Sequence, residues 1–162
     1  MEVLVDTTFL LPTLGVEVEE EAEEVIPLLS SVRVYYLEVS ILEAFWKYVK
    51  LGADAEVFEE GLEAIRSTYE LLTPGPRSYS LAAELYSLGH RDLIDDLIYA
   101  SSRESEVYLL TIDSAFLDFL RDSGLPTDSV LTPDAFKRLA GPRANAADRA
   151  ESRSRRSSSL ST

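Results

Sequence analysis

The stretch Val107-Tyr108-Leu109-Leu110-Thr111-Ile112-Asp113-Ser114-Ala115-Phe116 decides the fold of this chain. A short apolar run leads into Thr111 and Asp113 and a helical pattern follows, which is typical of a buried strand that ends in polar side chains. The chain begins in the same way, because Val3-Leu4-Val5 leads into Asp6-Thr7-Thr8. Since sites in open α/β sheets form where parallel strands end, the two acids predict a shared site.

Strands and helices alternate along the rest of the chain. Strands are expected at residues 3–6, 32–36, 107–111 and 129–131. Helices are expected at residues 9–11, 17–29, 41–51, 55–72, 78–88, 93–105, 114–121 and 133–139, with caps at Thr7 or Thr8 and at Asp54. The alternation predicts an α/β fold of three layers, in which helices enclose a central, mostly parallel sheet of about four strands.

The composition describes an acidic chain that is long enough for one domain with a proper core. The 162 residues carry a net charge of −14, but residues 1–140 carry −17 and residues 141–162 carry +3. We expect one domain over residues 1–140 and a disordered Arg/Ser-rich tail over residues 141–162, which has almost no apolar residues. Because so acidic a body repels nucleic acid on average, any contact with nucleic acid needs a local site.

The start of the chain gives no sign of export. MEVLVDTTFLLP has an acid at position 2 and lacks the basic region of a secretory signal. The longest apolar runs are too short to span a bilayer. The expected location is therefore the cytoplasm, without a membrane. There is no Cys, so disulfides and thiolate metal ligands are excluded.

One acid stands among large apolar residues of a predicted helix. Glu43 lies between Ile41-Leu42 and Ala44-Phe45-Trp46. Burying its carboxylate costs several kcal/mol unless a cation or hydrogen-bond donors meet it. The alternative is that Glu43 lies on a solvated helix stripe with Lys47 and Lys50.

Three more acids occur together at the start of the helix expected at residues 93–105. Asp92, Asp95 and Asp96 fall at positions i, i+3 and i+4, which places them on one helix face. Like charges at this spacing repel each other, and a bound cation would explain them. The alternative is a solvated helix start with Asp92 as the N-cap.

Four carboxylates can therefore gather at the carboxyl ends of the strands: those of Asp6, Glu43, Asp95 and Asp113. Oxygen ligands suit a hard divalent ion such as Mg²⁺. Two such ions can activate a water and stabilise the leaving oxygen of a phosphodiester, without a His, Cys or Ser nucleophile. No Walker loop, dinucleotide fingerprint or serine elbow is present in the sequence.

At these positions the chain resembles the PIN-domain ribonucleases over residues 1–136. The four motifs that carry the resemblance occur in the family's order: Asp6-Thr7-Thr8 after an apolar run, Leu42-Glu43, Asp95-x-Leu97-Ile98-x-Ala100, and Leu110-Thr111-x-Asp113-x-x-Phe116. The resemblance implies a PIN-like fold and an endoribonuclease that depends on Mg²⁺ or Mn²⁺. It implies that Asp6, Glu43, Asp95 and Asp113 are the metal-binding and catalytic acids, supported by Thr8, Asp92, Asp96 and Thr111. Thr8 stands where Ser or Asn is more usual, and it keeps the hydroxyl.

A lone PIN domain of this length is most similar to the VapC toxins of type II toxin–antitoxin pairs. That similarity implies a homodimer, an RNA substrate and a small antitoxin partner. A non-catalytic PIN-like scaffold and a DNA-directed nuclease of the same fold remain as alternatives. A haloacid-dehalogenase-type phosphatase is disfavoured, because Thr8 stands where that family needs a second Asp. The aromatic side chains at helical spacing are interpreted as core or dimer surface, although each could stack on a base: Phe45, Trp46, Tyr48, Tyr99 and Phe116.

Overall fold

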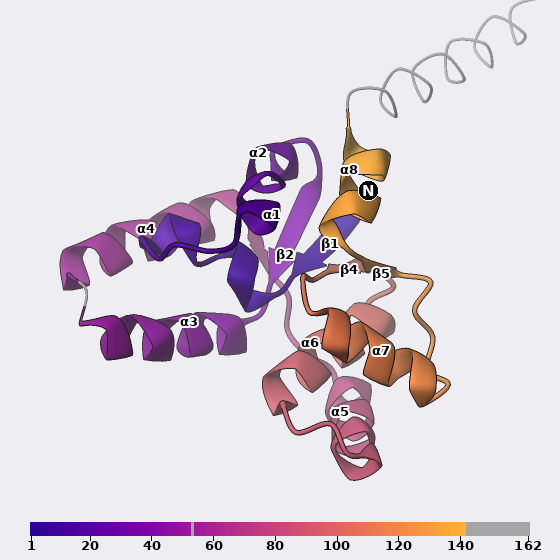
Figure 1. Cartoon of the computed structure of the whole chain (residues 1–162). Coiled ribbons are helices and arrows are strands. Elements are labelled where there is room, and N and C mark those ends of the chain that lie inside the picture. The colour runs from indigo at the N-terminus through magenta and orange to yellow at the C-terminus, as the bar shows by residue number, and fades with distance from the viewer. Residues whose placement is uncertain (53, 142–162) are drawn as a thin grey trace, which may run out of the picture.

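A parallel sheet of five strands lies at the centre of the molecule (Figure 1). The computed structural model describes residues 1–52 and 54–141, so the disorder expected for the tail falls, from residue 142 on, outside the described residues. The strand order is β3-β2-β1-β4-β5, and every neighbouring pair is parallel. The strands are β1 (Glu2–Val5), β2 (Arg33–Tyr36), β3 (Glu70–Leu71), β4 (Tyr108–Leu110) and β5 (Val130–Leu131).

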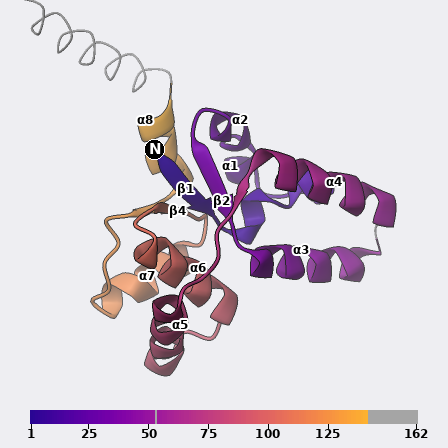
Figure 2. The same ribbon diagram turned by 180° about the vertical axis from the view of Figure 1, so that it is seen from behind.

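Helices cover both faces of this sheet, which confirms the predicted three-layer α/β fold (Figures 1 and 2). Two of the helices, η1 and η2, are short 3-10 helices. The helices α5, α6 and α7 cover one face of the sheet, and the other helices cover the opposite face. None of the described helices is long and apolar enough to cross a membrane. The helices are η1 (Thr7–Phe9), η2 (Pro12–Leu14), α1 (Glu20–Glu23), α2 (Ile26–Leu29), α3 (Glu38–Leu51), α4 (Ala55–Thr68), α5 (Pro76–Leu88), α6 (Leu93–Glu104), α7 (Ser114–Asp122) and α8 (Pro133–Ala140).

The alternation of side chains along β1 separates two apolar cores. Val3 and Val5 point to the face that is covered by α1 to α4 and α8, while Leu4 points to the face that is covered by α5 to α7. All three are fully buried. Because β1 is buried on both faces, its sequence is a continuous apolar run, as is usual for central parallel strands.

The sheet has one strand more than the sequence predicted. The helix expected at residues 55–72 ends at Thr68, and Tyr69 is already extended. Glu70 and Leu71 then form β3, which pairs with Tyr35 and Tyr36 of β2. The helical spacing of apolar residues continues through this segment. Its backbone nevertheless pairs with the free edge of β2 and becomes part of the sheet.

The prediction of a single helix at residues 17–29 is wrong. Two short helices, α1 and α2, replace it and are separated at Glu24 and Val25. Pro27 has no backbone N–H to donate to the preceding turn, so the chain starts a new helix with this residue in its first turn.

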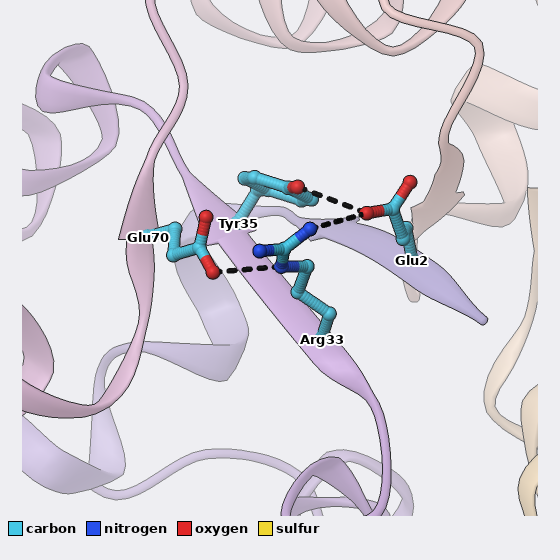
Figure 3. Close-up of polar contacts among 4 residues, drawn as sticks. All are labelled: Glu2, Arg33, Tyr35 and Glu70. Atoms are coloured by element: carbon cyan, nitrogen blue, oxygen red, sulfur yellow. Dashed lines mark hydrogen bonds and ion pairs between the residues drawn. The ribbon is translucent and has the colours of Figure 1, made fainter.

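An ion-pair network ties together the amino ends of three strands (Figure 3). Arg33 at the start of β2 contacts Glu2 of β1, with Nη1 3.0 Å from Oε1, and Glu70 of β3, with Nε 2.7 Å from Oε1. The hydroxyl of Tyr35 donates to the same oxygen of Glu2 over 3.1 Å. At this edge of the sheet the acidic side chains are paired with a cation, and each exposed pair stabilises the fold only modestly.

Gly61 allows α4 to cross η2 at close range. A Cβ at this position would collide with the carbonyl oxygen of Thr13 and would lie 2.9 Å from Cα of Leu14. Alanine favours a helix by about 1 kcal/mol over glycine. We nevertheless expect Gly61→Ala to lower the free energy of unfolding by about 1–3 kcal/mol, because the colliding atoms belong to the backbone.

Chemical denaturation of the variant and of wild type measures this effect. Gly52→Ala is the control, since a Cβ there has no atom within 4 Å and meets only the strain of a positive φ. A Gly61→Ala protein that is as stable as wild type would contradict the close crossing of α4 and η2.

Candidate functional site

The carboxyl ends of β1 and β4 lie next to each other at the middle of the sheet. From β1 the chain proceeds outward through β2 and β3, and it then returns to the other side of β1 to form β4 and β5. Crevices that bind ligands form at such switch points in open α/β sheets. Asp6 directly follows β1, and its N–H donates to the carbonyl of Leu110 at the end of β4 over 3.1 Å. Asp113 follows β4 by three residues.

A pocket of about 410 Å³ opens at this switch point. It gathers side chains from η1, α3, α6 and α7, which lie far apart in the sequence. All four predicted acids line it, and so do two of the predicted supporting residues. The polar lining consists of Asp6, Glu43, Asp95 and Asp113, of Thr8 and Asp92, and of Thr7, Lys47 and Ser114, which were not among the predicted site residues.

The two acids that follow strands are both held as helix caps. Asp6 caps η1, where its Oδ1 accepts the N–H of Thr8 over 2.8 Å, so the cap is Asp6 and neither of the threonines that the sequence suggested. Asp113 caps α7, where its Oδ1 accepts the N–H of Phe116 over 2.8 Å. Thr111 does not line the pocket; its buried hydroxyl accepts the N–H of Asp113 over 3.1 Å.

Glu43 reaches the pocket from α3 and combines both alternatives that the sequence left open. Its side chain is only 20% exposed, and it is met by a donor and by a cation. Oε2 accepts the hydroxyl of Thr7 over 2.5 Å, and Oε1 lies 2.7 Å from Nζ of Lys47. The spacing of four residues between Glu43 and Lys47 was visible in the sequence, whereas the contact with Thr7 depends on the packing of η1 against α3.

The acids of α6 do not share one face. Asp92 is the N-cap and accepts the N–H groups of Ile94 and Asp95, and Asp95 lines the pocket. Asp96 does not line the pocket; its side chain is fully buried, and its Oδ1 lies 2.7 Å from Nδ1 of His90. The His90 ring in turn packs against Phe116 of α7. Because successive residues of a helix point in different directions, Asp95 lines the pocket while the next residue, Asp96, points into the core.

The electrostatics of the pocket disfavour the charged forms of two acids. Burial raises the pKa of Asp6 to about 6, although hydrogen bonds from Thr111 and Thr8 oppose the shift. Burial, and after it the negative charges of neighbouring acids with Asp92 first among them, raises the pKa of Asp95 to about 8. Lys47 is the one cationic side chain in the described lining of this pocket. A bound cation would therefore relieve repulsion that the protein itself offsets only in part.

The donor set fits a hard divalent ion such as Mg²⁺ or Mn²⁺, because every acidic ligand offers oxygen. Within residues 1–52 and 54–141, no three acidic or imidazole side chains are grouped closely enough to hold an ion as they stand. Glu43 is engaged by Lys47 and Thr7, so coordination by Glu43 requires an exchange of the Lys47 contact for the ion.

Comparisons with known proteins agree with this architecture. A toxin–antitoxin complex from Klebsiella pneumoniae is similar with a TM-score of 0.54 and 18% identity, over 81% of this chain and 97% of that chain. VapBC2 from Rickettsia felis, bound to a DNA fragment from its promoter, is similar with a TM-score of 0.60 and 14% identity, over 82% and 98%. VapBC-1 from nontypeable Haemophilus influenzae is similar with a TM-score of 0.55 and 17% identity, over 83% and 99%.

At these identities the solved structures show a shared fold. A search among curated proteins found no match. The sequence model of the PIN domain, however, matches residues 3–120, which is most of the chain and includes all four acids of the pocket. The chain therefore belongs to the PIN domain family.

Proposed function

We propose that this chain is a divalent-metal-dependent endoribonuclease and the toxin of a type II toxin–antitoxin pair. PIN domains are generally nucleases. The observation that carries the proposal is the convergence of Asp6, Glu43, Asp95 and Asp113 on one pocket at the switch point of the sheet. A site built from carboxylates, with a single lysine, is suited to hydrolysis of a phosphodiester.

The four acids would hold Mg²⁺ or Mn²⁺, which when bound supplies Lewis-acid stabilisation of a phosphoryl oxygen and lowers the pKa of a water. The protein's own part is to fix these acids before the substrate binds. The N–H of Thr8 orients Asp6, the N–H of Phe116 orients Asp113, and the hydroxyl of Thr7 orients Glu43. These hydrogen bonds restrict the three side chains before the substrate binds, and Glu43 must still exchange its contact with Lys47 for the ion. Hydrolysis would leave 5′-phosphate and 3′-hydroxyl ends.

An exposed apolar face on α3 supports the proposed homodimer and antitoxin. Leu42 and Trp46 are 64% and 61% exposed, and Phe45 and Val49 of the same helix are exposed too. Contiguous apolar surface of this kind marks a protein interface more often than plain solvent contact. The three solved structures named above are toxin–antitoxin or VapBC assemblies, which favours a protein partner of the same type here.

Cleavage of a structured RNA by the purified full-length chain tests the proposed activity. We expect cleavage with Mn²⁺ and none with EDTA. Asp113→Asn should lose the activity, whereas Asp122→Asn, which removes an exposed acid from the other end of α7, should keep it. Cleavage of single-stranded DNA in place of RNA would identify a DNA-directed nuclease. Absence of both cleavage and Mn²⁺ binding would favour the non-catalytic scaffold.

A further inference from the structure

A second groove continues from the carboxylate pocket along η1 and the segment before α1. Its volume is about 440 Å³. The groove and the carboxylate pocket share three lining residues, Thr8, Lys47 and Ile112. The two cavities therefore form one continuous depression. A polymer whose phosphate lies in the carboxylate pocket therefore has room for a neighbouring unit in this groove. The remaining lining residues of the groove are Leu11, Glu17, Val18 and Glu19.

The floor of the groove is apolar. Leu11 is 7% exposed, and Val18 and Ile112 are half-buried members of the core on that face of the sheet. Aliphatic side chains of this kind contact the flat face of a ring without competing for its hydrogen-bonding edge. The floor therefore suits the nucleobase of a nucleotide better than its ribose or its phosphate.

The charged side chains at the rim of the groove favour different positions for the phosphate and for the base of a nucleotide. Glu17 and Glu19 are exposed acids, and an ionised carboxylate only accepts hydrogen bonds and repels phosphate. Lys47 stands at the boundary between the two cavities, and its ammonium can bind phosphate once Glu43 exchanges their 2.7 Å contact for the ion. A nucleotide unit fits this pattern in one direction, with its phosphate at Lys47 and its base between the two glutamates.

We propose that the groove is a subsite for one nucleobase adjacent to the scissile phosphate, in which Glu17 and Glu19 select a base with an exocyclic amino group. This inference rests on the proposed nuclease function. Cytosine, adenine and guanine each carry such a group, and a carboxylate accepts its N–H, as it does from cytosine N4 in DNA readout. Uracil presents a carbonyl oxygen at the corresponding place and is disfavoured.

Sequencing of the ends produced from a random RNA pool tests the selection. We expect wild type to cut with about tenfold depletion of uracil at one position next to the cleaved bond. The double variant Glu17→Gln with Glu19→Gln should lose this depletion, because an amide both donates and accepts. The matched control is Glu20→Gln with Glu21→Gln, which removes two charges from α1 outside the groove and should keep it. Cutting without any uracil depletion, or with depletion unchanged in the first double variant, would overturn the proposal.

Methyl NMR of the full-length chain with Mg²⁺ tests occupancy of the groove independently of cleavage. Added 5′-CMP should shift the methyl signals of Leu11, Val18 and Ile112 at lower concentration than 5′-UMP, and the difference should shrink in the first double variant. Equal effects of the two nucleotides, or no shift of these methyls, would overturn the base subsite. Methyl shifts without RNA cleavage would contradict the nuclease proposal alone, and cleavage without methyl shifts would contradict the subsite alone.

Discussion

Asp95→Asn is expected to reduce RNA cleavage by about 10³-fold and, in the same protein, to raise the melting temperature. The activity falls because one of the four carboxylates that would hold the metal becomes a neutral amide. The melting temperature rises because Asp95 is crowded by Asp92, Asp6, Glu43 and Asp113, and ionisation of its buried side chain costs stability. A residue that serves only the fold would move both quantities in the same direction.

The stability gain of Asp95→Asn should depend on pH in the metal-free protein. The pKa of Asp95 is about 8 in the folded chain, above the ordinary value of 3.8 that applies after unfolding. Between these values the folded state keeps a proton that the unfolded state has lost, so the stability of wild type falls as pH rises from about 4 to 8. We expect the variant to be more stable by about 1–3 kcal/mol at pH 8, with little difference at pH 4.

Thermal unfolding in EDTA across this pH range provides the measurement. Asp122→Asn serves as the control, because it removes the same charge from an exposed position on α7. A parallel response of the two variants, or full cleavage activity in Asp95→Asn, would contradict the role that we assign to Asp95.

His90→Ala is expected to destabilise the protein by about 2–4 kcal/mol. The carboxylate of Asp96 is fully buried, and His90 is the partner of its Oδ1, at 2.7 Å. Its Oδ2 has no hydrogen-bond partner within the part of the chain that the structure describes. Without His90 the whole carboxylate would be buried and unpaired. The variant also loses the contacts of the imidazole ring with Phe116 and Phe119.

A double-mutant cycle separates the polar interaction from the packing. Denaturant titrations of His90→Ala, Asp96→Ala and the double variant give the coupling free energy directly. We expect the double variant to be less destabilised than the sum of the single variants, since it no longer buries an unpaired acid. Additive effects would show that the two side chains contribute independently.

Local patterns in the sequence were sufficient for most of the candidate site. An apolar run followed by an acid located Asp6 and Asp113 at the ends of neighbouring strands, because parallel strands end at one edge of the sheet. Capping preferences located Asp54 at a helix start and offered Asp92 as an alternative cap, and both side chains cap helices in the structure. These features depend on a few adjacent residues, and such residues are what a sequence pattern describes.

The features that the sequence did not indicate depend on distant contacts. β3 has two residues, and its pairing with β2 across more than thirty residues of chain decides its conformation. Asp96 follows Asp95 in α6, and its buried contact with His90 depends on the packing of the segment before the helix. Thr7 becomes part of the pocket because η1 packs against α3 and brings its hydroxyl to Glu43.

The central pairing of β1 with β4 also sets the order in which the protein can acquire activity during synthesis. Val5 pairs with Leu110, so the two strands that precede Asp6 and Asp113 meet only after most of the chain has been made. Closure of so long a loop is slow compared with the formation of the helices between the strands. A nascent chain that ends before β4 lacks the pocket, and the nuclease that we propose would remain inert on the ribosome until this strand emerges.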